Sequence, residues 1–141
     1  MSFRIGDIVY FTPYYFTDTG FSKDHFALVL LPENLTGYSN NIYCAVLTSK
    51  KPRLDYFCVT LSSNNYLFFS KETYIDLKSQ DLQSLSDLRD EKVVVPLSRS
   101  DLISVYRKLK KCLFVPSLPT SKIDPYLRAT ILREWKKIVK Q

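Results

Sequence analysis

Six consecutive apolar residues, Phe-Ala-Leu-Val-Leu-Leu, occupy positions 26–31 of the chain. The run follows the polar stretch 22–25 and ends at Pro32, and it contains no glycine or proline. A short apolar run bounded in this way is typical of a strand that is buried on both faces of a sheet. We therefore predict that this strand lies in the core and that the rest of the chain is organised around it.

Polar and basic residues adjoin this strand and the next one. His25, the only histidine of the chain, directly precedes the apolar run. The next strand-like run, residues 41–47, is followed by a polar and basic stretch: Thr48, Ser49, Lys50 and Lys51. A core strand beside a polar and basic end is where we expect the chemistry of the protein.

The remainder of the first two-thirds of the chain is rich in aromatic and β-branched residues, which favour strands. The predicted strands are residues 8–12, 26–31, 42–48, 55–61, 66–69, 73–77 and 93–97. Residues 13–21 and 32–40 are predicted to be loops, and residues 62–65 a hairpin connection. Leucines at a spacing of three predict a helical turn or two within residues 80–88.

Two amphipathic helices are predicted after the strands. Ser98, with Asp101 three residues later, is a variant of the capping box that opens a helix. Asp124 and Pro125 are the favoured pair for the N-cap and first position of a second helix. The layout predicts a mainly β fold with C-terminal helices (α+β), in which about six or seven short strands form a compact barrel. Closing the barrel would remove exposed strand edges.

Length and composition restrict the class of protein. A chain of 141 residues with a hydrophobic share of 45% is expected to fold as one domain. No apolar run approaches the ~20 residues that cross a bilayer, and residues 1–7 do not resemble a secretory signal, so we expect a cytoplasmic protein. The cysteines Cys44, Cys58 and Cys112 are predicted to be buried thiols. With one histidine and no paired cysteines, we expect no metal and no other cofactor.

The net charge of +6 is unevenly distributed. Residues 107–141 contain ten lysines and arginines against two acidic residues, a net charge of +8, whereas residues 1–106 carry −2. Such an asymmetry is compatible with an anionic partner, either nucleic acid or an acidic protein segment. From charge alone, the preferred interpretation is a pair of helices whose charged faces are solvated.

Four segments, in this order and spacing, resemble the MazF/PemK family of toxins. Gly6-Asp7-Ile8-Val9 matches the family's opening GDIV or GDLI, and residues 22–30 lie where the family has a loop ending in R-P-A-L-V-L. Residues 46–50 match a strand that ends in T-S or T-T, and residues 94–113 match the closing strand, serine and helix. The likeness covers residues 6 to about 113. It divides the single domain into a barrel (1–97), the family helix (98–113) and an additional helical extension (114–141).

The resemblance implies an SH3-like barrel, usually a homodimer, that cleaves single-stranded RNA without a metal. Such a protein is the toxin of a bacterial type II toxin–antitoxin pair, and its partner is an antitoxin that is usually acidic. The family's catalytic threonine corresponds by position to Thr48, with Ser49 beside it. Its catalytic arginine is replaced here by His25, and the proline after that arginine by Phe26.

The replacement of arginine by His25 changes the expected chemistry. An arginine grips phosphate with two donors and a permanent charge, whereas a histidine transfers protons near neutral pH. Lys23, Lys50 and Lys51 are predicted to supply positive charge. Further RNA-binding candidates are Tyr14 and Tyr15, whose rings would stack on unpaired bases, and Asp76, which loosely matches an acidic family position.

Each of these residues also has a structural interpretation. His25 and Thr48 would then only begin and end strands, and the protein would be a non-catalytic barrel that binds RNA or a protein. The second helix carries an apolar stripe that includes Ile131 and Trp135. We expect this stripe to pack on the barrel. The alternative is that this helix extends a dimer or antitoxin surface, in which case Trp135→Ala would weaken self-association.

Overall fold

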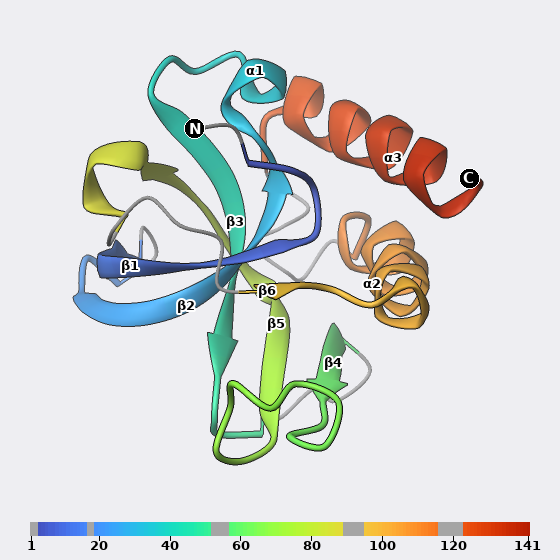
Figure 1. Ribbon diagram of the computed structural model, residues 1–141. Helices are drawn as coiled ribbons and strands as arrows, with labels where there is room; N and C mark the ends of the chain where they lie inside the picture. Colours follow the sequence, from blue (N-terminus) through green and yellow to red (C-terminus); the bar gives the residue numbers. More distant parts are fainter. Residues whose placement is uncertain (1–2, 17–18, 52–56, 89–94, 116–122) are drawn as a thin grey trace.

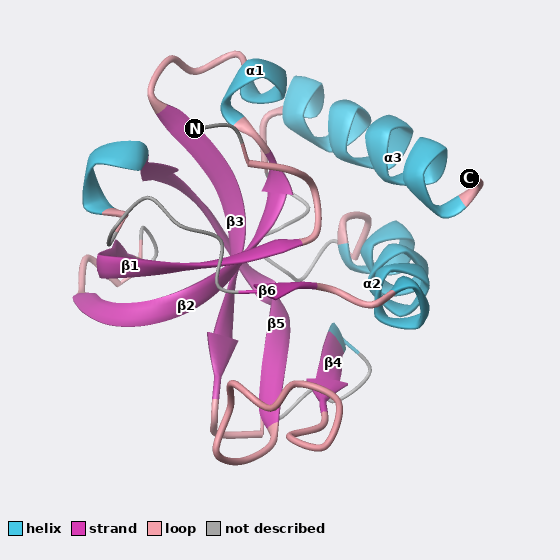
Figure 2. Ribbon diagram, viewed as in Figure 1, coloured by secondary structure: helices cyan, strands magenta, loops and turns pink. Residues whose placement is uncertain are grey.

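The computed structural model describes residues 3–16, 19–51, 57–88, 95–115 and 123–141 (Figure 1). Six strands form one antiparallel sheet with the order β4-β5-β3-β2-β1-β6. The strands are β1 (Asp7–Tyr15), β2 (Ser22–Leu31), β3 (Asn41–Thr48), β4 (Cys58–Leu61), β5 (Thr73–Ser84) and β6 (Val95–Pro96). The helices are α1 (Glu33–Thr36), η2 (Leu85–Asp87), α2 (Arg99–Cys112) and α3 (Pro125–Val139). The predicted mainly β fold with C-terminal helices is confirmed (Figure 2).

The apolar run in β2 lies at the centre of the core, as predicted. Every residue from Ala27 to Leu31 is fully buried. Leu28 and Leu30 belong to the larger cluster of buried side chains, which also includes residues of α2 and α3. Ala27 and Val29 belong to a second cluster on the other face, inside the curl of the sheet. A strand covered on both faces has no position for a polar side chain, which explains the unbroken apolar run.

Several strands extend beyond their predicted ends because cross-strand pairing continues. Tyr14 pairs with Lys23 and Tyr15 with Ser22, so part of the segment predicted as the loop 13–21 is strand. The predicted loop 32–40 contains the short helix α1. The strand predicted over residues 66–69 is wrong, because backbone hydrogen bonds from Tyr66 and Phe69 close turns there.

The helical turn predicted within residues 80–88 is confirmed only for η2. Residues 80–84 belong to β5 instead, because they pair with β3 from Gln80↔Ala45 to Ser84↔Asn41. The register of this pair shifts between Ala45 and Val46, where β5 carries extra residues. Such an irregularity bends a strand and increases its twist, so the second half of β5 is free to turn toward β1.

A side-chain amide joins β5 to β1 where the sheet curls. Gln83 is 1% exposed, its Nε2 donates to the carbonyl oxygen of Tyr15 at 2.6 Å, and its Oε1 accepts from the backbone N–H of Tyr15 at 2.9 Å. A bridge between Phe11 and Leu88 lies nearby. Gln83 thus satisfies two backbone groups that a closed ladder would pair. Among the described residues, the sheet itself ends at β4 and β6, which are not paired with each other.

Both C-terminal helices begin at their predicted caps. The side chain of Ser98 accepts from the N–H of Asp101, and that of Asp124 accepts from the N–H of Tyr126. Trp135 is fully buried, and its Nε1 donates to the carbonyl oxygen of Leu30 at 2.9 Å. The expected packing of α3 on the barrel is therefore confirmed. The alternative that α3 extends a dimer or antitoxin surface stays a prediction, and any such contact would not use the fully buried ring of Trp135.

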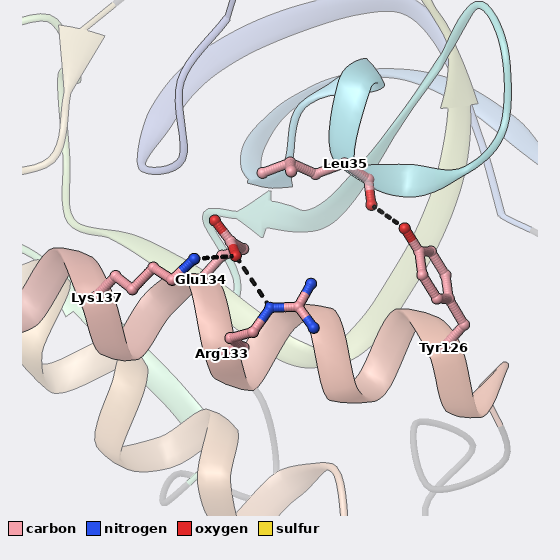
Figure 3. Close-up of polar contacts among 5 residues, drawn as sticks. All are labelled: Leu35, Tyr126, Arg133, Glu134 and Lys137. Carbon is pink, nitrogen blue, oxygen red and sulfur yellow. Dashed lines mark hydrogen bonds and ion pairs between the residues drawn. The ribbon is translucent and has the colours of Figure 1, made fainter.

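A polar contact also holds α3 beside α1, because the hydroxyl of Tyr126 donates to the carbonyl oxygen of Leu35 at 3.4 Å (Figure 3). Within α3 itself, Glu134 pairs with Arg133 and Lys137. At the other end of the helix, the guanidinium of Arg99 in α2 donates to the last carbonyls of α3. The extension therefore docks at both ends as well as along its apolar stripe.

The three cysteines are buried thiols outside any disulfide, as predicted. Burial raises the pKa of the Cys44 thiol well above its ordinary value. Across the described residues, no helix has both the length and the apolar content required to span a membrane.

Candidate functional site

A pocket of about 480 Å³ opens where β2 begins and β3 ends. Its walls come from four places in the chain: β1, the first half of β2, the end of β3 with the following turn, and the loop that leads into β5. The lining residues are Tyr10, Lys23, Asp24, His25, Phe26, Leu47, Thr48, Ser49, Lys50, Phe69, Ser70, Lys71 and Thr73. Five of the nine residues predicted for the site therefore share one pocket.

The register of β2 and β3 explains why the two predicted catalytic residues meet. Ala27 pairs with Val46 in this antiparallel ladder. Two further steps along the same register lead to His25 on one strand and Thr48 on the other. The ladder itself ends at Ala27 and Val46, and the side chain of His25 then contacts the carbonyl oxygen of Leu47. His25 and Thr48 therefore line one pocket where β2 begins and β3 ends.

His25 is half-buried and has a defined orientation. Its Nδ1 lies 3.1 Å from the carbonyl oxygen of Leu47, and the edge of the ring meets Phe16 with 5.4 Å between ring centroids. A carbonyl oxygen only accepts, so Nδ1 carries the proton and Nε2 is the basic nitrogen of the neutral ring.

Burial is the largest influence on the charge of His25, and it lowers the pKa of the ring below 6.5. The hydrogen bond to Leu47 acts in the opposite direction, Lys23 lowers the pKa further, and Asp24 raises it. The net direction is downward. The neutral ring, with Nε2 able to accept a proton, is therefore the main form at neutral pH.

Thr48 ends β3 with its hydroxyl oxygen held in a turn. Its Oγ1 accepts from the backbone N–H of Lys50 at 3.2 Å. Because this bond uses a lone pair of the oxygen, the hydroxyl proton remains available to a bound group. Ser49 and Lys50 follow in the same turn and are exposed. The turn thus presents a hydroxyl donor beside an ammonium group.

Three lysines surround the pocket: Lys23, Lys50 and Lys71. Sequence reasoning missed Lys71, together with Tyr10 and Phe69. The pairing of Thr48 with Tyr74 brings the residues before β5 next to the end of β3. The strand wrongly predicted over residues 66–69 gave no reason to place Lys71 near Thr48. A loop at these residues would have allowed the chain to fold back, so that Lys71 lies beside the end of β3.

The structure does not bring the other predicted residues into the pocket. Tyr14 is fully buried, with its hydroxyl 3.4 Å from Asp81, so its ring has no face free for stacking. Tyr15 is about half exposed but holds Gln83 through its backbone and does not line the pocket. Asp76 forms an ion pair with Lys78 at 3.5 Å. Lys51 is exposed and also lies outside the lining.

No protein-family model matches the chain, and no curated protein matches it in sequence. Solved structures do match. The Mycobacterium tuberculosis toxin MazF-mt6 has a TM-score of 0.59 and 15% identity, covering 77% of this chain and 97% of that chain. A second solved structure, described as an Mtb toxin, has a TM-score of 0.52 and 14% identity, covering 71% of this chain and 98% of that chain. This protein therefore has the fold of the MazF toxins.

Proposed function

We propose that this protein is the toxin of a type II toxin–antitoxin pair and a metal-independent endoribonuclease that cleaves single-stranded RNA. The observation that carries the proposal is the pocket that contains His25 and Thr48 together with Lys23, Lys50 and Lys71. A base, a hydroxyl donor and several cations around one cavity suit a phosphodiester substrate. The fold shared with the toxin MazF-mt6 supports the same assignment.

His25 is the general base of the proposed reaction. In RNA cleavage without a metal, the 2′-hydroxyl attacks the adjacent phosphorus and the 5′-oxygen leaves, which produces a 2′,3′-cyclic phosphate. Nε2 of His25 accepts the 2′-hydroxyl proton, because Nδ1 is already bonded to Leu47. The pKa of the ring, lowered by burial, keeps this nitrogen unprotonated at neutral pH.

Thr48 and the lysines stabilise the negative charge that develops on phosphorus. The hydroxyl of Thr48 donates to a non-bridging oxygen, and Ser49 offers a second hydroxyl beside it. Lys23, Lys50 and Lys71 replace the permanent charge that an arginine at position 25 would provide, although as separate point charges without a two-pronged grip. Their ammonium groups also offer protons for the leaving 5′-oxygen.

The proposed protein partner is an acidic antitoxin segment, and the proposed assembly of the free toxin is a homodimer. Acidic side chains would compete with RNA phosphates for the three pocket lysines, so inhibition and substrate binding would use the same charges. Inhibition by such a segment should weaken as salt is added, because these lysines are exposed to solvent.

Cleavage of a long single-stranded RNA in EDTA tests the proposal directly. The wild type should cut and release 2′,3′-cyclic phosphate ends, whereas His25→Ala and Thr48→Ala should lose most of this activity. Thr60→Ala is the matched control, because Thr60 is exposed on β4 and does not line the pocket. Cutting that persists in both site variants would contradict the assignment of His25 and Thr48.

A second candidate function is a non-catalytic barrel that binds RNA or a protein. The contact between His25 and the carbonyl of Leu47 favours it, since a histidine that only closes a strand end would make the same bond. RNA binding without cutting by the pure, folded wild type would establish this alternative. The pocket lysines would then act as a phosphate-binding surface alone.

A further inference from the structure

An exposed phenylalanine stands beside the pocket. Phe68 belongs to the loop between β4 and β5, shown in green in Figure 1, and 60% of its side chain is exposed. Its neighbours in space are Phe26 and Phe69, which both line the pocket. Phe68 does not line the pocket itself, so it extends the apolar wall of the pocket outward to the surface.

The ring of Phe68 is held in place by its edge contacts. It meets Phe26 with 5.4 Å between centroids and an interplanar angle of 84°, and Phe69 with 5.6 Å and 89°. Phe26 and Phe69 meet with 5.4 Å between centroids and an angle of 87°, and Phe26 also contacts Tyr10 with 4.5 Å between centroids. Perpendicular contacts are a favoured geometry for aromatic pairs. They fix the orientation of Phe68 and leave much of the ring open to solvent.

The charge around the ring distinguishes among its possible ligands. Lys71 lies three residues after Phe68, and Lys50 and Lys23 line the same pocket. A fixed aromatic ring next to a cationic cavity is the combination that binds single-stranded nucleic acid, with bases stacked on the ring and phosphates on the lysines. Phe68 and its neighbour Leu67 alone form too small an apolar surface for a stable protein interface, which buries about 800 Å² on each partner.

We propose that Phe68 is a stacking site for one unpaired base of an RNA whose adjacent phosphate occupies the pocket. The inference rests on the proposed function for the nature of the ligand, but not on cleavage. Phe68 takes the role that the sequence had suggested for Tyr14. Because every base has an aromatic face, this contact should add affinity and position the strand without selecting one base strictly.

Binding of a single-stranded 2′-O-methyl oligonucleotide in EDTA tests the inference, because such a strand has no free 2′-hydroxyl to attack. Phe68→Ala should raise the Kd roughly 10-fold, which lies within the range of free energies for stacking one base on an aromatic ring. Phe68→Trp should restore the wild-type Kd. The matched control is Phe21→Ala, since Phe21 is exposed and lies outside the pocket lining. 2-Aminopurine placed at successive positions should show one position whose fluorescence is quenched by the wild type and not by Phe68→Ala.

The possible outcomes separate this inference from the proposed function. If the wild type binds the oligonucleotide and Phe68→Ala binds equally well, the stacking site is refuted and RNA binding stands. If the wild type does not bind the oligonucleotide, the stacking proposal is refuted, and cleavage of unmodified RNA in EDTA decides the proposed function separately. If Phe68→Ala instead changes the sedimentation of the free protein, Phe68 is a contact between copies of the chain, and the stacking proposal is overturned.

Discussion

The Nδ1–H of His25 donates to the carbonyl oxygen of Leu47, across the boundary between β2 and β3, at 3.1 Å. This bond leaves Nε2 as the only basic nitrogen of the neutral ring and directs proton transfer to it. It also links the predicted base to the strand that ends in Thr48.

The rate of RNA cleavage should rise with pH through an apparent pKa below 6.5. Burial lowers the pKa of His25, and the neutral ring is the form that accepts a proton. Activity should therefore be constant at neutral pH and fall as the solution becomes more acidic. The profile of kcat/KM between pH 4.5 and 8 measures this. A midpoint clearly above 6.5 would contradict a buried histidine base.

The same lowered pKa predicts how His25 affects stability. The unfolded chain binds the His25 proton more readily than the folded protein, so the free energy of unfolding rises with pH between the two pKa values. This contribution is complete above pH ~6.5 and decreases as the pH falls toward the folded pKa. Urea titrations of wild type and His25→Gln measure this at pH 7 and pH 5. The free energy of unfolding should fall less between pH 7 and pH 5 in the variant than in the wild type.

The hydroxyl of Thr48 should be essential, and its methyl group should not. Thr48→Ser keeps the donor and should retain activity within a few-fold. Thr48→Val keeps the shape but removes the donor, and it should lower kcat ~10²-fold, as for the loss of one oxyanion donor. Equal activity in the two variants would show that Thr48 only ends the strand. Circular dichroism of both proteins would confirm an unchanged fold.

The pocket lysines should account for most of the salt dependence of RNA binding. Single strands give a slope of about −0.7 for each phosphate contact in a plot of log K against log salt. Replacing Lys23, Lys50 or Lys71 by alanine should remove about one phosphate contact. The slope should then become less negative by the amount expected for one contact. Lys136→Ala, an exposed change in α3, is the control and should leave the slope unchanged. The reverse result would place the RNA on the basic C-terminal helices.

Gln83 should stabilise the curl of the barrel through its two bonds to Tyr15. Gln83→Ala leaves these backbone groups without their partner and should cost about 1–3 kcal/mol of unfolding free energy. Gln83→Glu tests the mechanism, because a buried carboxylate cannot donate to the carbonyl of Tyr15. Its defect should be larger at pH 7 than at pH 4.5, where the carboxyl group is protonated more readily. Urea denaturation measures both variants.

Trp135 should contribute to folding and not to self-association. Trp135→Ala removes a fully buried ring and its bond to Leu30, and should destabilise the protein by about 3–5 kcal/mol. Trp135→Phe keeps much of the volume and should cost less. Sedimentation of the better-folded phenylalanine variant should show the mass distribution of the wild type. A change in the mass distribution would contradict this and would indicate that α3 contributes to self-association.

Features that depend on neighbours in the chain were predictable from the sequence. The apolar run before Pro32 predicted a strand buried on both faces, because consecutive apolar residues alone indicate such burial. Ser98 and Asp124 predicted where α2 and α3 begin, because a cap bonds to a backbone group two or three residues away. His25 and Thr48 were predicted as site residues from the resemblance to the MazF/PemK toxins, and both line one pocket, although their roles stay a prediction.

Features that depend on distant pairing were decided only by the tertiary structure. The leucines at positions 82, 85 and 88 suggested one or two helical turns, but pairing with β3 kept Leu82 in β5, where Gln83 is buried against Tyr15. Tyr14 turned inward because β1 continued past its predicted end. Lys71 lines the pocket and Phe68 lies beside it, because Tyr74 at the start of β5 pairs with Thr48. In these segments, hydrogen bonds and burial between distant parts of the chain outweigh local propensity. The paired strands lie too far apart in the sequence for a local pattern to reveal the pairing.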